Sequence, residues 1–221
     1  MALAYVNSGV TGQNADPAIH NLAWSPTAGN LIVVAITVWG DGVSPSGTCT
    51  DNKGNTYTNA GVIRKSTDNS IQAQIWYSVI TTGGSGMTVS VDFPYNTDQT
   101  LIVAEYSGQA ASPTVLTNGA GGNSTNPTCG AVNPTGTNLY VAVLSHGANA
   151  NPTESWTVRQ EAQNNGYTRY SFMDMIGTGS QTGSWALATG QWACTEATFD
   201  SGVSNLLINV ADCVQAKAQP V

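Results

Sequence analysis

A strand-forming string occurs twice in this chain of 221 residues and limits the folds that the chain can adopt. Residues 26–33 read Pro-Thr-Ala-Gly-Asn-Leu-Ile-Val, and residues 134–141 read Pro-Thr-Gly-Thr-Asn-Leu-Tyr-Val. In both places a turn signal leads into an apolar, β-branched run whose residues are apolar at odd and even positions alike. Such a run predicts a strand that is covered on both faces. We therefore expect two equivalent halves that superpose with Leu31 over Leu139.

The rest of the composition predicts an all-β protein without a long helix. The chain holds 24 Gly and only 9% charged residues, so it is poor in strong helix formers and rich in turn formers. Several segments alternate between apolar and polar residues, as half-buried antiparallel strands do. The expected strands are Leu31–Trp39, Ile71–Ile80, Met87–Phe93, Leu101–Tyr106, Leu139–His146, Tyr167–Ile176 and Trp192–Phe199, with a last one over Leu206–Val210.

This strand pattern predicts one antiparallel β-sandwich of jelly-roll type, built from two pseudo-repeats and spanning residues 1–221. The first repeat covers residues 18–110 and the second covers residues 128–214. Residues 110–127, rich in Gly, Asn, Ser, Thr and Pro, form either a linker or a crossover. Two tandem immunoglobulin-like β domains are the alternative. A half with few strands does not easily cover both of its faces alone, and this favours the single sandwich.

The charge balance argues against nucleic acid and membrane partners. The formal net charge is −7, and the six Lys and Arg are scattered, so the basic stripe of a nucleic-acid binder and a polybasic membrane patch are both missing. No apolar run approaches the roughly 20 residues of a membrane span. The start of the chain lacks the features of a secretory signal. We therefore expect synthesis in a cytoplasm and no insertion into a membrane.

No group of residues in the sequence matches a catalytic, cofactor or metal site. His20 and His146 are the two histidines, and we interpret both as structural. Residues 51–57 predict a tight hairpin turn, because a calcium loop needs more carboxylates and a distal Glu. Glu105 and Glu196 occupy similar places in the two halves, which indicates shared structure more than a pair of catalytic acids. The sequence thus predicts no catalytic residue, no cofactor and no metal.

The cysteines allow two interpretations. Buried free thiols are one, and zinc-type Cys-x-x-Cys spacing is absent. The other is a disulfide between Cys194 and Cys213, formed in an oxidising medium. If residues 192–199 and 206–213 form a hairpin about the turn between them, these two cysteines lie opposite each other at a distance compatible with a bridge. The four cysteines are Cys49, Cys129, Cys194 and Cys213.

Three tryptophans of the second half are candidates for contacts with a partner. Trp156, Trp185 and Trp192 lie within one part of the sequence, and exposed indoles anchor protein interfaces or stack on sugar rings. Packing in the core is the competing interpretation for each. Trp39 and Trp76 are expected in the core because of their strand context.

Four motifs give most of the chain a resemblance to a known group. These are Pro-x-x-Gly-Asn-Leu before an apolar run, Asp-x-x-Gly-Asn-x-Tyr, an Ile-Trp-Tyr strand and Glu-Tyr-Ser-Gly, at residues 26–39, 51–57, 75–77 and 105–108. In this order they resemble a loose group of all-β structural proteins of tailed phages and prophages, and related modules of bacterial surface proteins. The second half lacks the Asp-x-x-Gly-Asn-x-Tyr motif. The resemblance implies a scaffold and carries over no active-site residue.

The functional expectation is a non-enzymatic virion protein, either a capsid decoration (cement) protein or a head or tail fibre subunit. Its expected partners are a capsid or tail protein and sister subunits, and its expected location is the virion. A glycan-binding module that attaches a phage or bacterium to a surface, found on the virion or at a cell surface, is the alternative. A hydrolase is the third and weakest hypothesis.

Overall fold

The computed structural model describes residues 1–13, 19–39, 47–61, 64–67, 69–92, 98–148, 150–164 and 168–202, and these form strands, turns and loops without a helix. All strand pairs are antiparallel, as predicted. The expected all-β class is therefore confirmed.

The first half forms two sheets. The first main sheet has the order β1 (Ala4–Gln13), β9 (Asp98–Ser107), β3 (Leu31–Trp39), β7 (Ile71–Val79) and β5 (Thr58–Asn59), and β6 (Arg64–Lys65) also pairs with β7. The first outer sheet has the order β2 (Ile19–Trp24), β8 (Met87–Asp92) and β4 (Thr48–Asp51). Along the chain, β1 to β5 and β7 to β9 alternate between the two sheets, whereas β5, β6 and β7 all belong to the first main sheet, so most connections cross from one sheet to the other.

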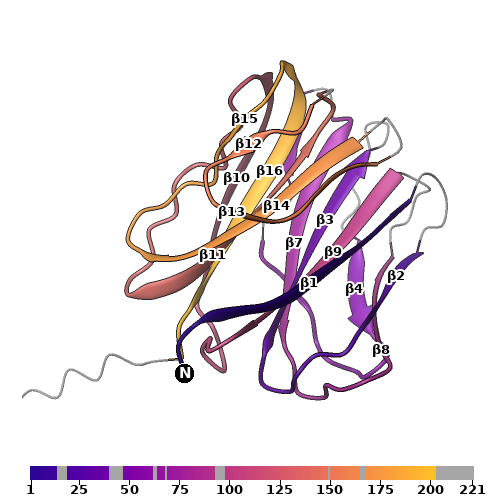
Figure 1. Cartoon of the computed structure of the whole chain (residues 1–221), viewed down its shortest axis with the longest axis vertical. Coiled ribbons are helices and arrows are strands. Elements are labelled where there is room, and N and C mark those ends of the chain that lie inside the picture. The colour runs from indigo at the N-terminus through magenta and orange to yellow at the C-terminus, as the bar shows by residue number, and fades with distance from the viewer. Residues whose placement is uncertain are drawn as a thin grey trace, which may run out of the picture.

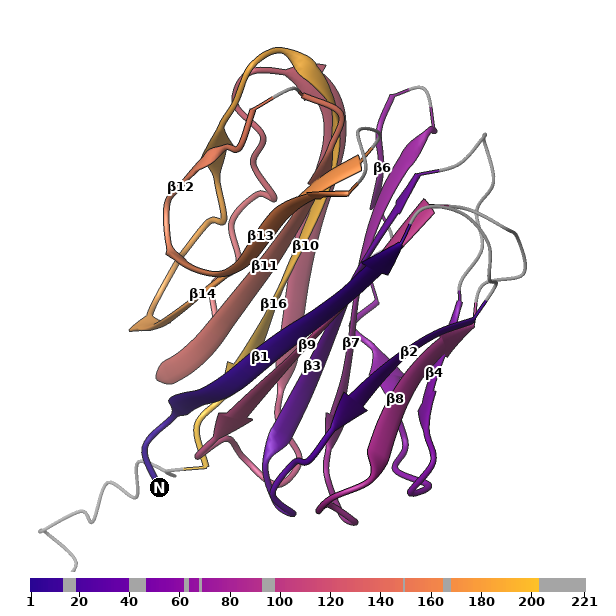
Figure 2. The same cartoon turned by 45° about the vertical axis from the view of Figure 1, so that its right-hand side comes forward.

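The second half has a similar arrangement. The second main sheet has the order β10 (Val115–Ser124), β16 (Gly190–Asp200), β11 (Thr137–His146), β14 (Thr168–Thr178) and β13 (Thr157–Asn164). A small second outer sheet consists of β12 (Thr153–Glu154) and β15 (Trp185–Ala186). In Figures 1 and 2 the first outer sheet lies to the right of the first main sheet, and the second half lies to the left.

The two main sheets face each other across a central hydrophobic cluster that takes residues from both halves. In β3, Leu31, Val33 and Ala35 face this cluster, whereas Ile32 and Val34 face a second cluster under the first outer sheet. The corresponding strand β11 is also buried on both faces, with a third cluster under the second outer sheet. This double coverage explains why both strands are apolar at odd and even positions.

The seven strands predicted between residues 31 and 199 are present, with ends that shift by a few residues. Tyr167, at the predicted start of β14, Phe93, at the predicted end of β8, and the predicted strand Leu206–Val210 lie outside the described residues. The interpretation of residues 110–127 as a linker or crossover is wrong. Residues 115–124 form β10, because their backbone pairs along its full length with β16, and small residues such as Gly122 leave room for the indole of Trp192.

Leu31 and Leu139 each lie on the central strand of a main sheet, β3 and β11. Leu31 stands opposite Val79 and Tyr106, and Leu139 stands opposite Ile176 and Phe199. The pairing of β3 with β9 begins at Leu31, whereas the pairing of β11 with β16 begins one residue before Leu139, at Asn138.

Candidate functional site

A buried polar cluster joins the two halves, and we call it the clamp. The Asp174 carboxylate of β14 accepts hydrogen bonds at Oδ2 from Arg159 Nε and from the Tyr106 hydroxyl of β9, both at 2.8 Å. The Arg159 guanidinium also lies 3.8 Å from the centre of the Tyr5 ring in β1. The side chain of Asp174 is 4% exposed and that of Arg159 is 26% exposed. The clamp thus links strands of both main sheets through a shielded charge pair.

A β-bulge explains how Arg159 reaches the clamp. The register of β13 against β14 shifts between Val158 and Gln160, so Arg159 is the extra residue. Bulges re-aim a side chain out of the regular alternation. Burial raises the pKa of the Tyr106 hydroxyl, as does the neighbouring Asp174 charge, so Tyr106 acts as a hydrogen-bond donor.

The Asp51 turn is a structural lock. Asp51 Oδ1 accepts the backbone N–H groups of Lys53 and Asn55, and Oδ2 accepts Asn55 Nδ2 and the Tyr57 hydroxyl. Asn55 Oδ1 in turn accepts the backbone N–H of Thr81 at 2.9 Å. The prediction of a hairpin is wrong, because β4 and β5 on either side belong to different sheets. The Asp51 carboxylate thus fixes the connection between β4 and β5, which passes from the first outer sheet to the first main sheet.

Glu105 and Glu196 do not occupy corresponding positions. Glu105 stands opposite Ile32, one residue after Leu31, whereas Glu196 stands opposite Ala142, three residues after Leu139. Glu105 is well bonded: its Oε1 accepts the Thr27 N–H and Asn30 Nδ2. The predicted equivalence of the two glutamates is therefore wrong.

Glu196 is a buried carboxyl group whose two oxygens differ. Its Oε2 accepts the Gly183 backbone N–H at 2.6 Å, while Oε1 has no hydrogen-bond partner among the described residues. Burial raises the pKa of Glu196 to about 7, against the opposing effect of the Gly183 hydrogen bond. This carboxyl ties the segment between β14 and β15 to the outer face of the second main sheet.

The pH dependence of stability follows from this carboxyl group. The folded state holds a proton on Glu196 that the unfolded chain, with a pKa near 4.5, releases. Stability from this group is therefore lost as the pH rises from about 4.5 to about 7, by about 3 kcal/mol. Urea unfolding across this pH range should show the loss in the wild-type protein and not in Glu196→Gln. Subtracting the unfolding free energies of the two proteins at each pH removes the contribution of the titratable groups that they share. Equal pH profiles would contradict the assignment.

Two neighbouring carboxyl groups of the second half belong to Glu154 and Glu161. Glu154 Oε1 accepts the Ser171 hydroxyl at 2.9 Å, and Trp185 Nε1 donates to the same hydroxyl oxygen at 3.1 Å. Burial, followed by the charge of Glu154, raises the pKa of the neighbouring Glu161. Glu154 therefore orients Trp185 through two hydrogen bonds that meet at the Ser171 hydroxyl.

His146 is fully buried at the end of β11. Neither ring nitrogen has a hydrogen-bond partner among the described residues. Burial, followed by the charge of Arg169, lowers the pKa of His146 to about 4. The imidazole is therefore neutral near pH 7. His20 belongs to β2, and its side chain lies outside the description.

The candidate tryptophans pack against the interior of the chain. Trp185 and Trp192 are 3% and 7% exposed and belong to the third cluster, and Trp192 Nε1 donates to Ser124 Oγ at 3.0 Å. Trp156 is half-buried and packs edge-on against Tyr140, with ring centres 6.0 Å apart. The three indoles therefore gather around one core, and two of them have little ring surface to offer a partner. Trp39 and Trp76 are partly buried against the first two clusters.

The geometry behind the predicted Cys194–Cys213 bridge is wrong. β16, which contains Cys194, has β10 on one edge and β11 on the other, so no following strand can pair beside it. Cys194 and Cys49 are buried free thiols, Cys129 is buried, and Cys213 lies outside the described residues.

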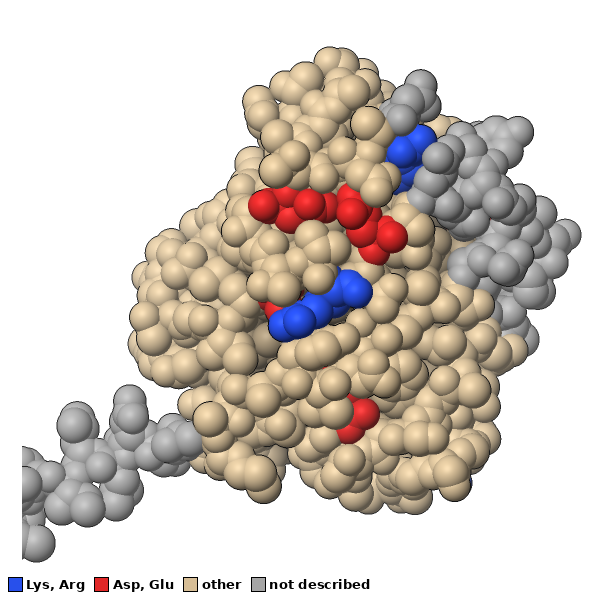
Figure 3. All heavy atoms as spheres, in the orientation of Figure 1, with Lys and Arg blue, Asp and Glu red and all other residues tan. Residues whose placement is uncertain are grey.

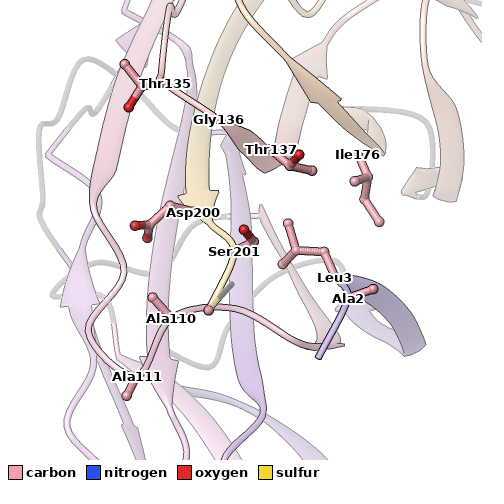
Figure 4. A pocket seen from close by; sticks show the side chains of 11 residues that line it. Ala2, Leu3, Ala110, Ala111, Thr135, Gly136, Thr137, Ile176, Asp200 and Ser201 are labelled. Atoms are coloured by element: carbon pink, nitrogen blue, oxygen red, sulfur yellow. The ribbon is translucent and has the colours of Figure 1, made fainter. Parts of the chain in front are cut away.

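A hollow of about 770 Å³ lies where the two halves meet near the start of the chain. Figure 4 shows Leu3 and Ile176 on one side of it, with the Asp200 carboxylate on the other. Asp200 Oδ1 accepts the Thr114 N–H at 2.7 Å. The lining is otherwise small, apolar or hydroxylated, so this hollow offers shape and apolar surface more than reactive groups.

The view in Figure 3 shows a largely uncharged surface on which most of the visible acidic groups form a short band near a basic group. Within the described ranges, no three His, Cys, Asp or Glu residues are grouped so that they could hold a metal ion. The part of the chain that the structure describes has no helix long and apolar enough to cross a membrane.

Sequence reasoning missed the clamp. The available signal was Asp174, a lone carboxylate in the run Ser-Phe-Met-Asp-Met-Ile of a predicted strand. A buried charge in such a strand requires a partner, but the partners Arg159 and Tyr106 come from distant parts of the chain.

Comparisons with protein-family models, with curated protein sequences and with solved structures found no match to this chain.

Proposed function

We propose that this protein is a non-enzymatic structural component of a tailed-phage virion, either a capsid decoration protein or a head or tail fibre subunit. The observation that carries the proposal is the clamp together with the central cluster, which ties two β halves into one block. A block held by both apolar packing and a shielded charge pair suits a mechanical role. The resemblance of its motifs to phage structural proteins points the same way.

The use of the polar side chains supports this role. Asp51 and Glu105 accept bonds that fix turns, and Asp174 joins the halves. Each of these groups acts on the chain itself. The proposed partners are therefore a capsid or tail protein and sister subunits, which this protein would contact through its largely uncharged surface.

We also propose that each half is a jelly roll and that the halves arose by duplication. The order β1-β9-β3-β7 against β2-β8-β4, with β1 to β5 and β7 to β9 alternating between sheets, is the supporting observation for the first half. The order β10-β16-β11-β14 supports the same arrangement in the second half. The repeated Pro-Thr-x-x-Asn-Leu-x-Val string adds sequence support. The jelly roll is thus assigned to each half instead of to the chain as a whole.

Glycan binding can be tested at a hollow beside the second outer sheet. This shallow hollow of about 430 Å³ is lined by residues that include Asn126, Thr153, Glu154 and Trp185. The low exposure of Trp185 limits stacking on a sugar ring, which makes this the weaker proposal.

Sedimentation with phage particles tests the proposed function. Purified protein is mixed with capsids or tails that lack it, and the particles are pelleted. We expect saturable binding at a fixed ratio to capsid or tail subunits, and no depletion onto glycan-coated beads. Binding to the glycan beads alone, abolished by Trp185→Ala in a folded protein, would replace the structural proposal with the adhesion hypothesis.

A further inference from the structure

The outer strands of the main sheets differ in how they are protected against pairing with another chain. Natural proteins protect such edges with short strands, bulges, charges or proline. β5 and β6 are two residues long, and β1 and β13 carry bulges. β13 also carries Arg159 and Glu161. β10 alone among these edges is long and regular.

β10 offers ten residues without a bulge, a charge or a proline, in the sequence Val-Leu-Thr-Asn-Gly-Ala-Gly-Gly-Asn-Ser. Leu116 N donates to Thr198 Oγ1, and Asn118 O accepts from Thr195 Oγ1, so the even-numbered peptide groups face β16. The odd-numbered groups then face the open edge. Of these, the Gly119 N–H donates to its neighbour Asn118 Oδ1.

We propose that β10 pairs antiparallel with β10 of a second copy of this chain, joining two five-stranded main sheets across a twofold axis. In the virion, this contact would be the interface between sister subunits. Only this virion context rests on the proposed function; the pairing of two copies does not. The pairing extends the sheet by main-chain hydrogen bonds, the usual way in which an exposed edge binds a strand.

The charge of the chain limits where two copies can meet. With a net charge of −7, two copies repel each other over most approaches, and an uncharged strand is where they meet with least repulsion. A twofold axis makes such an interface self-complementary.

The side chains of β10 also suit self-pairing. Antiparallel pairing about the middle of the strand places Leu116 of one copy beside Gly122 of the other. Leu116 is 38% exposed, and Gly122 has no side chain and lies against the Trp192 indole. Leu116 then packs beside that indole, in the manner of a cross-strand aliphatic and aromatic pair.

Analytical ultracentrifugation over a concentration series tests the contact with the full-length protein. We expect a reversible dimer, weakened roughly tenfold or more by Leu116→Lys, which puts a charge on the edge and removes apolar contact. Val158→Lys is the matched control, since Val158 is 37% exposed and lies on β13 at the opposite edge of the same sheet. It should dimerise as the wild type does.

Hydrogen exchange of residues 115–124 identifies the surface that is used. The proposal is supported if the outward-facing amides of β10 exchange slowly in the wild-type protein, and if their exchange becomes faster on dilution and in Leu116→Lys. Gly121→Pro, which removes one outward N–H, provides a second variant if Leu116→Lys fails to fold. A wild-type protein that stays monomeric, with these amides either open or protected, overturns the proposal, as does a dimer that both lysine variants weaken equally. Particle binding is a separate measurement, so its failure would leave this result standing.

Discussion

Phe199→Ala is expected to lower the free energy of unfolding by about 3–5 kcal/mol, as large-to-small changes of buried phenylalanine do. Phe199 is fully buried in β16 of the second half and packs edge-on against Tyr77 of the first half, with ring centres 5.2 Å apart. Because this ring belongs to the cluster shared by both halves, its loss should destabilise both together. Chemical unfolding followed by tryptophan fluorescence and by circular dichroism measures the change.

The control for this prediction is Ile176→Ala. Ile176 is 46% exposed, so its truncation should change stability by only about 0.5 kcal/mol. Wild-type protein should unfold in one transition by both probes. Two separate transitions, of which Phe199→Ala moves only one, would show that the halves fold independently.

Asp174→Ala is expected to lower the free energy of unfolding by about 3 kcal/mol. The substitution leaves the Arg159 charge and the buried Tyr106 hydroxyl without the carboxylate that accepts their hydrogen bonds. The partial exposure of Arg159 allows water to solvate some of its charge, which keeps the loss at the lower end for a broken pair. The measurement is urea unfolding of the variant against the wild type at neutral pH.

Tyr106→Phe separates the two bonds of the clamp. It keeps the buried ring and removes only the hydroxyl, so a smaller loss of about 1.5–2 kcal/mol is expected. A double-mutant cycle between Arg159→Met and Asp174→Ala should return a favourable coupling energy. Independent, additive effects of these two changes would contradict the role of the clamp.

The central strands were predictable because each has a local signature. Leu31–Trp39 is apolar on both faces and is bounded by turn residues, and β3 has these same bounds. β10 was missed for the opposite reason. Its run Asn-Gly-Ala-Gly-Gly-Asn is typical of a flexible linker, and only its pairing with β16 and its packing under Trp192 make it a strand. Tertiary context outweighs weak local preference here.

The polar sites divide in the same way. The Asp51 turn lies within seven residues, so sequence alone indicated a turn, although it did not show that the turn joins two sheets. The clamp joins Tyr106 to Asp174 across 68 positions and depends on a bulge that re-aims Arg159. A pattern within one short segment of sequence cannot predict a hydrogen bond between residues that only the tertiary fold brings together. The misplaced match of Glu105 with Glu196 arose because the chain gives no local sign of strand register.

Electron cryomicroscopy of the native particle gives the most direct test of the proposed virion role. We expect density for two packed β halves at regular positions on a capsid or tail, contacting particle subunits through their uncharged surface. Tryptic peptides of this chain should be present in the same purified particles at a fixed ratio to the major capsid protein. Particles that contain neither the density nor the peptides, from cells that make the protein, would contradict the assignment.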